Sequence, residues 1–205
     1  MSRLFIIPCK PLARAKQRLA PMLAPDDRIR LVLAMLADVG EAAVACDQTW
    51  VLCSDEAAAE VAIRLGAAAV EDTTPDGGLN SSLRAALARA VAEGYENAII
   101  VAADLGCIAA EDLAAVPPAA VAIAPSSDGS GTNVLALSPP DALDPAFGPA
   151  SRTAHEAAAR AGGFEPFILQ RPRLALDVDT PDDLRHARTL GPGKATGTLM
   201  DSLGL

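Results

Sequence analysis

Three aspartates have the residue type and the spacing that best suit a metal-binding site. Asp104 directly follows the apolar run 99–103, and an unpaired carboxylate at the buried end of a strand would be costly. Asp177 and Asp179 are two residues apart, so on a strand both point to one face. Mg²⁺ takes hard oxygen ligands from one or two carboxylates. A magnesium site at Asp104, Asp177 and Asp179 is one interpretation, and a helix cap before Pro181 is the alternative for Asp179.

A group of early cations is the second candidate. Residues 1–30 carry seven basic and two acidic side chains, a net charge of +5, although the whole chain has a net charge of −9. Cations gathered in one segment of an acidic chain favour an anionic ligand, and a solvated basic helix face is the alternative. The basic residues of this segment are Arg3, Lys10, Arg14, Lys16, Arg18, Arg28 and Arg30.

Two further features are less specific. The segment Pro125–Asn133 combines hydroxyls with glycines, which lets backbone N–H groups approach a phosphate, but a plain hairpin turn fits equally well. His155 and His186 fall on predicted helices, where a surface or internally hydrogen-bonded histidine is commoner than a catalyst.

The elements that must position these residues alternate between strands and helices. This alternation predicts an α/β fold with a mainly parallel sheet and helices on both faces. Ligands then bind beyond the carboxyl ends of the strands. Strands are expected at Leu4–Ile7, Thr49–Cys53, Ala67–Val70, Ala98–Ala102, 121–124, 133–137 and 174–178. Helices are expected from Asp26, from Ser54 to Leu65, from Asn80 or Ser81 to Glu93, and at 151–161 and 181–190. We expect one domain over 1–190 and a Gly- and Thr-rich tail, 191–205, that is flexible or contacts a partner.

Composition excludes several classes of protein. The net charge of −9 and the 3% aromatic content argue against nucleic acid as a partner. No run approaches the roughly 20 apolar residues of a membrane helix, and no signal-peptide core precedes Lys10, so we expect no membrane and a cytoplasmic location. The four cysteines form no Cys-x-x-Cys pair, which favours reduced thiols over a zinc site. Neither a P-loop, a Gly-x-Gly-x-x-Gly nor a Gly-x-Ser-x-Gly motif is present.

Taken together, the motifs resemble the 2-phospholactate and phosphoenolpyruvate guanylyltransferases of coenzyme F-420 biosynthesis, within the MobA-like nucleotidyltransferases. The resemblance covers residues 5–190. Its opening pattern matches Pro8, Lys10, Ala15, Lys16, Arg18 and Leu19, its Gly-Leu-Asn matches Gly78–Asn80, and its Ala-Asp-Leu matches Ala103–Leu105. Its Gly-Thr-Asn matches Gly131–Asn133, its Phe-Gly-x-x-Ser and following His match Phe147, Gly148, Ser151 and His155, and its closing motif matches Leu176, Asp177, Asp179, Thr180, Asp183 and Leu184. Gly106 departs from the family, which commonly has proline there, beside the expected metal site.

The resemblance implies a single-domain, three-layer Rossmann-like nucleotidyltransferase fold. It also implies GMP transfer from GTP to the phosphate of 2-phospho-L-lactate, phosphoenolpyruvate or 3-phosphoglycerate, with release of pyrophosphate and with Mg²⁺ as cofactor. In this interpretation Lys10, Lys16 and Arg18 are catalytic, and Lys10, Arg14, Lys16, Gly78 and Asn80 bind the nucleotide. Thr132, Gly148 and Ser151 hold the acceptor, and Asp104, Asp177 and Asp179 hold the metal.

Two alternatives remain open at this point. One is another MobA-like nucleotidyltransferase, acting in molybdenum-cofactor or sugar-phosphate activation, although such relatives open with a Gly-rich loop in place of the segment after Ile7. The other is a nucleotide-binding module without turnover. The apolar tail Leu199–Leu205 could also pack on a second copy of the chain and form a homodimer.

Overall fold

The computed structural model describes residues 2–72 and 77–205, apart from the side chain of Arg14. Its strands form one mixed sheet in the order β3-β2-β1-β4-β6-β5-β7. Within the described residues β6 is the one antiparallel strand, paired with β4 on one side and β5 on the other. The strands are β1 (Arg3–Pro8), β2 (Gln48–Cys53), β3 (Ala68–Glu71), β4 (Asn97–Val101), β5 (Val121–Pro125), β6 (Thr132–Leu137) and β7 (Phe167–Ile168).

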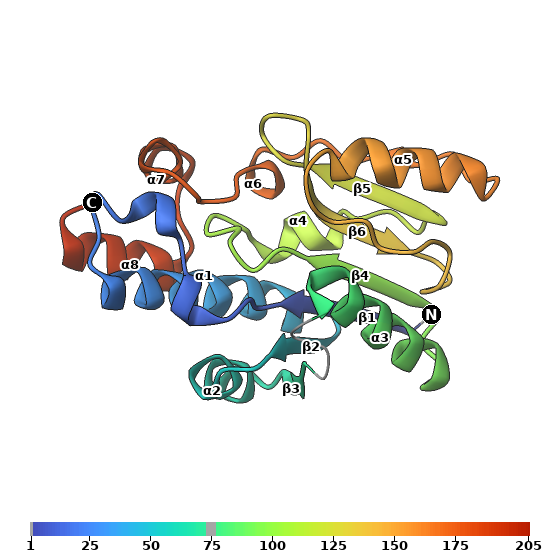
Figure 1. Cartoon of the computed structure of the whole chain (residues 1–205), viewed down its shortest axis with the longest axis horizontal. Helices are drawn as coiled ribbons and strands as arrows, with labels where there is room; N and C mark the ends of the chain where they lie inside the picture. The colour runs from blue at the N-terminus through green and yellow to red at the C-terminus, as the bar shows by residue number, and fades with distance from the viewer. Residues whose placement is uncertain (1, 73–76) are drawn as a thin grey trace.

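Helices lie on both faces of this sheet (Figure 1). They are α1 (Pro25–Val44), α2 (Glu56–Leu65), α3 (Leu79–Ala92), α4 (Ala110–Ala114), α5 (Ser151–Ala161), α6 (Pro172–Ala175), α7 (Pro181–Leu190) and α8 (Lys194–Leu203). Two short 3₁₀ turns, η1 (Leu12–Arg14) and η2 (Gln17–Leu19), lie in the loop after β1.

Side-chain alternation along the strands creates the three layers. Phe5 and Ile7 of β1 pack with residues of α1, α2, α4 and α6. Leu4 and Ile6 point to the opposite face and pack with residues of α3 and α5. Because successive strand side chains face opposite ways, an apolar run buries both faces of the sheet. The expected α/β fold is confirmed, and α1 and α3 begin within two residues of the positions expected.

A third apolar cluster lies beyond the sheet, beside the loop after β1. It joins Leu19 and Leu23 of that loop to Met35 of α1, Leu184 of α7 and Met200 of α8. α8 occupies the segment where a tail is expected. The Asp38 carboxylate accepts hydrogen bonds of 2.8 Å from the backbone N–H groups of Ala195 and Thr196, which caps the start of this helix against α1.

The segment before α7 differs from expectation. The strand expected at 174–178 is wrong, because 172–175 form α6 and the following residues run extended without a strand partner. Burial still alternates there, with Val178 fully buried between the half-buried Asp177 and Asp179. The Val178 N–H donates to the carbonyl of Asp104 at 3.1 Å, which fixes this segment beside the end of β4. No described helix is long and apolar enough to cross a membrane.

Candidate active site

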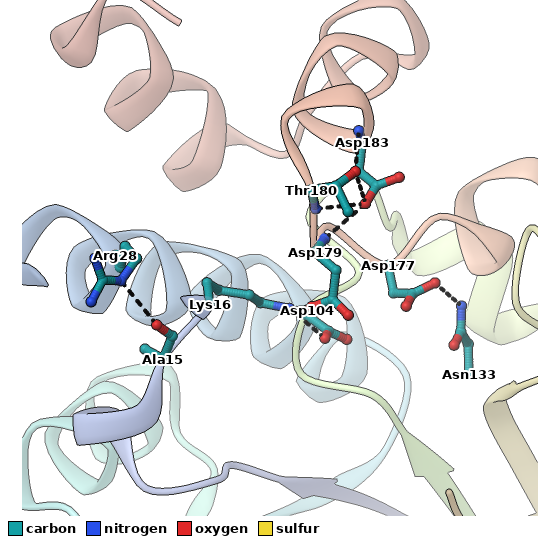
Figure 2. Close-up of polar contacts among 9 residues, drawn as sticks. All are labelled: Ala15, Lys16, Arg28, Asp104, Asn133, Asp177, Asp179, Thr180 and Asp183. Carbon is teal, nitrogen blue, oxygen red and sulfur yellow. Dashed lines mark hydrogen bonds and ion pairs between the residues drawn. The ribbon is translucent and has the colours of Figure 1, made fainter. Parts of the chain in front are cut away.

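Lys16 lies between two of the aspartates singled out by the sequence. Its Nζ donates to Asp104 Oδ2 at 2.6 Å and to Asp179 Oδ1 at 2.7 Å (Figure 2). The Lys16 side chain is 8% exposed, whereas Asp104 and Asp179 remain 30% and 42% exposed. We call Lys16, Asp104, Asp177 and Asp179 the charged cluster. The structure thus brings together residues that lie 88 and 163 positions apart in the sequence.

The loop after β1 is built to present Lys16. The Arg28 side chain is buried, and its Nε and Nη1 donate to the carbonyls of Ala15 at 3.1 Å and Leu23 at 3.0 Å. Lys16 has a φ of 41°, in the left-handed region that costs energy for a residue with a side chain. The contacts of this loop keep Lys16 in the unfavourable conformation, and its ammonium lies between two carboxylates.

The charges within the charged cluster stabilise each other. Burial opposes the charge on Lys16, but Asp104 and Asp179 outweigh it and raise the pKa of Lys16 above its ordinary value. Burial likewise opposes ionisation of Asp179, and nearby Lys16, Arg18 and Lys10 lower its pKa below the ordinary value. Lys16 is therefore an ammonium and Asp179 a carboxylate at neutral pH.

Asp177 is held in a different way. Burial and the charge of Asp104 raise its pKa, and the hydrogen bond from Asn133 partly opposes the rise. Asn133 Nδ2 lies 3.2 Å from Asp177 Oδ1 and also donates to the carbonyls of Leu174 and Ala175 at 3.0 Å. Burial is the largest cause of the raised pKa of Asp177, and the charges of Asp104 and Asp179 add to it.

Helix capping does not account for Asp179. The N-cap of α7 is Thr180, whose hydroxyl accepts from the Asp183 N–H while the Asp183 carboxylate accepts from the Thr180 N–H. Asp183 also accepts from the backbone N–H of Asp179 at 3.0 Å. The Asp179 side chain is thereby left to Lys16, and the helix-cap alternative is wrong.

The early cations divide into two groups. Lys10 and Arg18 are exposed, lie close enough to Asp179 to lower its pKa, and form no ion pair with another described residue. Arg28 instead holds the loop, Arg3 pairs with Asp47, and Arg30 pairs with Asp27. Arg14 belongs to η1, and its side chain lies outside the described part of the chain.

A second set of contacts surrounds Thr132 at the start of β6. Thr132 Oγ1 lies 3.0 Å from Nδ1 of His155 on α5, and Nε2 of His155 accepts from the Ala146 N–H at 2.9 Å. His155 is fully buried, which lowers its pKa to about 4. The histidine is therefore neutral and internally hydrogen-bonded, as the commoner interpretation of the sequence has it.

Asn80 holds the same loop from α3. Its Nδ2 donates to the Phe147 carbonyl at 2.9 Å, and its Oδ1 accepts from the Phe147 N–H at 2.7 Å. Gly148 follows with a φ of 136°, where a side chain would be strained. Ser151 is buried and donates its N–H to the Gly148 carbonyl at 3.1 Å. We call Thr132, His155, Asn80 and the loop 146–148 the neutral cluster.

The resemblance implies that Gly78 and Asn80 bind the nucleotide. Gly78 is the N-cap of α3 and has a φ of 77°, which favours glycine. Residues 73–76 lie outside the described residues. Both polar atoms of the Asn80 side chain are engaged by Phe147, so its visible role is to hold the loop.

The turn between β5 and β6 binds its own carboxylate. Asp128 accepts from the Ser126 hydroxyl at 2.6 Å and from the Ser130 N–H at 2.9 Å. These hydrogen bonds lower the pKa of Asp128 to about 2. The tip of this turn is therefore a hairpin closed by Asp128, which favours the hairpin interpretation of Pro125–Asn133 over an anion-binding loop.

Gly106 lies at a helix contact. A Cβ there would lie 3.1 Å from Met35 Cγ and 3.2 Å from Thr196 Cγ2, and the Gly106 carbonyl accepts from the Gly193 N–H at 2.7 Å. This residue makes room for α8 to pack against α1. A side chain at this position would require Met35 or Thr196 to move.

Three residues with clear roles were not identified from the sequence as site residues. They are His155, Asn133 and Arg28, and each acts through hydrogen bonds to residues distant in the chain. In the sequence, His155 and Asn133 belong to family motifs and Arg28 belongs to the basic segment. Neither observation predicts which residue each side chain contacts. Among the described residues, no three His, Cys, Asp or Glu side chains are grouped so as to hold a metal ion by themselves.

Known proteins resemble this chain over most of its length. A family model described as "Guanylyl transferase CofC like" matches residues 3–205. A phosphoenolpyruvate guanylyltransferase of Sphaerobacter thermophilus is 40% identical over 193 residues, covering 91% of this chain and 92% of that protein. One from Mycobacterium sp. strain KMS is 44% identical over 200 residues, covering 93% of this chain and 88% of that protein.

Solved structures show the same fold at lower identity. A putative nucleotide-diphospho-sugar transferase from Desulfovibrio desulfuricans superposes with a TM-score of 0.77 at 17% identity, covering 99% of this chain and 97% of its own. The Mycobacterium tuberculosis protein Rv0371c, solved in complex with manganese, superposes with a TM-score of 0.54 at 21% identity, covering 91% of this chain and 97% of its own. These likenesses identify the sheet and its helices as a nucleotidyltransferase fold.

Proposed function

We propose that this chain, which belongs to the CofC-like guanylyl transferase family, transfers GMP from GTP to the phosphate of phosphoenolpyruvate. The guanylyltransferase function in coenzyme F-420 biosynthesis expected from the motifs is confirmed by the family and by the curated relatives. The alternatives, another MobA-like transferase or a module without turnover, are not favoured by these relatives. The choice of GTP and of phosphoenolpyruvate is our proposal, and the names of those relatives support it.

The reaction makes limited demands on the protein. A phosphate oxygen of the acceptor forms a bond to the α-phosphorus of GTP, and the bond from that phosphorus to the β-phosphate oxygen breaks, so pyrophosphate leaves with the electron pair. The acceptor phosphate is already an anion and needs no general base. The protein must align attacker and leaving group and neutralise the charge that develops on the phosphates.

Lys16 carries this proposal because of its two contacts. An ammonium has three N–H groups, and the contacts with Asp104 and Asp179 use two of them. The third N–H can donate to a phosphate oxygen without breaking the ion pairs. Lys10 and Arg18 are exposed beside Asp179 and supply further positive charge for the triphosphate and the departing pyrophosphate. We assign Arg14, on the same loop, to the triphosphate by family resemblance.

The charge of the site is the argument for a metal. The positive charges of Lys10, Lys16 and Arg18 are matched in number by the carboxylates of Asp104, Asp177 and Asp179, so only Arg14 adds a surplus for a multiply charged nucleotide. Carboxylate oxygens are the ligands that Mg²⁺ prefers, and Asp104 and Asp179 already converge on one cation, the Lys16 ammonium. We propose that Asp104 with Asp177 or Asp179 would hold Mg²⁺. When bound, this ion supplies positive charge at the phosphates.

The neutral cluster is our proposed acceptor site. Thr132, Gly148 and Ser151 come together around the loop 146–148, and the resemblance assigns the acceptor's carboxylate and phosphate to these residues. Gly78, at the start of α3, is a proposed nucleotide-binding residue on the same basis. The resemblance also assigns Asn80 to the nucleotide, but we propose that Asn80 supports the acceptor site through its contacts with Phe147.

The test is pyrophosphate release with GTP, Mg²⁺ and each of phosphoenolpyruvate, 2-phospho-L-lactate and 3-phosphoglycerate in parallel. We expect release with phosphoenolpyruvate, loss of release without Mg²⁺, and little release when ATP or CTP replaces GTP. Product mass, measured by mass spectrometry, should equal the acid plus GMP less water. Release with another acid alone would overturn the proposed acceptor, and silence with all three acids would overturn the proposed reaction.

A further inference from the structure

The two ring nitrogens of His155 have different partners, and this fixes where its proton lies. Nε2 is 2.9 Å from the backbone nitrogen of Ala146. A backbone N–H can only donate, so Nε2 must be the acceptor and carries no proton. A neutral imidazole has one proton, which therefore lies on Nδ1. The Nδ1–H group points at Thr132 Oγ1, 3.0 Å away, and donates to it.

This arrangement determines what the Thr132 hydroxyl can do. Its oxygen accepts from His155, so its own proton must point elsewhere. Thr132 is buried, and among the described residues its side chain has His155 as its hydrogen-bond partner. A buried hydroxyl proton without a protein acceptor is suited to a ligand that brings acceptor oxygens, such as a carboxylate or a phosphate.

The surroundings hold the His155 ring in this orientation. The ring of Phe147 packs edge-on against it, with centroids 5.0 Å apart and an interplanar angle of 70°. The ring is fully buried, and burial lowers the pKa of His155 to about 4. The ring therefore stays neutral near pH 7. Asn80 fixes the other side of the same loop through the backbone of Phe147. Movement of the loop 146–148 would therefore disturb the Ala146 contact and the ring together.

We propose that His155 is a positioning residue that turns the Thr132 hydroxyl into a dedicated hydrogen-bond donor to the anionic acceptor, while its other nitrogen holds the loop 146–148. This inference rests on the proposed function, because it requires that the acceptor binds at the neutral cluster. His155 itself need not touch the substrate, and it acts through Thr132.

Two replacements of His155 separate its two contacts. In His155→Asn the amide nitrogen occupies about the position of Nδ1 and can still donate to Thr132. In His155→Gln the amide lies about where Nε2 was, so it can accept from Ala146 but leaves Thr132 without its donor. We expect His155→Gln to raise the KM for the acid about tenfold, the size expected for one lost hydrogen bond to a charged group. His155→Asn keeps the donor to Thr132 but loses the Ala146 contact, so it should raise the acid KM less, by a few-fold, and the KM for GTP should change in neither variant.

A double-mutant cycle distinguishes positioning from a merely structural role. Thr132→Val removes the hydroxyl while keeping the shape of the side chain, and Thr132→Ser keeps the hydroxyl. If His155 acts through Thr132, the variant carrying both Thr132→Val and His155→Gln should raise the acid KM no more than Thr132→Val alone. Thermal unfolding of each variant, with His186→Asn on the exposed face of α7 as the control, shows whether it is folded. If His155→Gln does not fold, Thr132→Val against Thr132→Ser still tests the hydroxyl: a shared KM overturns the proposal.

The remaining outcomes separate this inference from the proposed function. Wild-type protein without GMP transfer to any of the three acids overturns both. Wild-type transfer with an unchanged acid KM in His155→Gln overturns the role of His155 alone. The same holds if the two substitutions are additive in the cycle, or if the KM values for GTP and for the acid rise together.

Discussion

The charged cluster and the neutral cluster lie at the same edge of the sheet but are held by different forces. In the charged cluster, one buried ammonium holds two carboxylates from segments distant in sequence. In the neutral cluster, neutral hydrogen bonds to backbone and side chains share the task among Asn80, Thr132 and His155. Removing one charge unbalances all of its neighbours, whereas removing one neutral hydrogen bond leaves the others in place. We therefore expect the charged cluster to control kcat and the neutral cluster to control the KM for the acid.

The largest expected effect is that of Asp104→Asn. The substitution removes one of the carboxylates proposed to hold the metal, and we expect kcat to fall at least about a hundredfold. Lys16 keeps its partner Asp179, so the variant should remain folded. Pyrophosphate release and thermal unfolding measure the two effects, with Asp201→Asn, an exposed residue of α8, as the matched control. Normal turnover in Asp104→Asn would disprove the metal assignment.

Lys16→Met should rank next. We expect kcat to fall about a hundredfold, because a buried cation facing the phosphates is lost. Without nucleotide, the variant should bind Mn²⁺ more tightly than the wild type, since the ammonium no longer occupies the space between Asp104 and Asp179. Electron paramagnetic resonance of free Mn²⁺ measures this binding, and Lys194→Met on the exposed side of α8 is the control. Weaker Mn²⁺ binding in Lys16→Met would show that the carboxylates do not act as a cation site.

Asn80→Ala tests the neutral cluster with a smaller effect. The Phe147 backbone would lose both hydrogen bonds from the Asn80 side chain, and we expect the KM for the acid to rise a few-fold to about tenfold. Asn80→Asp keeps the acceptor for the Phe147 N–H but sets a carboxylate oxygen against the Phe147 carbonyl, so its effect should be at least as large. A rise in the KM for GTP alone would instead place Asn80 at the guanosine and separate it from the neutral cluster.

The titration of His155 should have the smallest effect on turnover. It should instead change the free energy of unfolding as the pH falls. Its pKa is about 4 in the folded protein and near 6.5 when unfolded, so the unfolded chain binds the extra proton between these values. Its contribution to the free energy of unfolding is fully present above pH 6.5 and is lost as pH falls toward 4, by about 3 kcal/mol. Denaturant unfolding of the wild type and of His155→Gln at a series of pH values measures the difference. An equal pH dependence in both proteins would show that His155 is not held neutral.

The sequence was sufficient for most of the sheet because its strands are buried on both faces. Continuous apolar runs such as 98–101 are distinctive, and the expected bounds differ from the observed ones by about one residue. The strand expected at 174–178 was wrong because alternation of burial is not specific to sheets. Val178 is buried by α7 and α8, and one hydrogen bond to Asp104 replaces a strand partner. α8 was missed because its start is capped by Asp38, a residue 157 positions earlier.

The candidate site was predictable in its residues and not in its contacts. Motif resemblance singled out Lys16, Asp104 and Asp179 together, and the structure places them in contact. Charge counting could not tell Arg28, buried under the loop, from the exposed Lys10, because both are basic residues of one segment. Hydrogen bonds such as that between Thr132 and His155 depend on how α5 packs on the sheet, which no local pattern encodes.

The start of β6, the antiparallel strand, fixes the number of residues between the β5–β6 turn and Thr132. Thr132 and Asn133 are consecutive, so they face opposite sides of the sheet, Thr132 toward α5 and Asn133 toward α6. One strand start thus serves both clusters at once. Adding a single residue between the turn and Thr132 would move Thr132 to the place of Asn133, and deleting one would move Asn133 to the place of Thr132. In either case both clusters would lose their own residue. The spacing between the β5–β6 turn and β6 is therefore fixed by the contacts of both clusters at once.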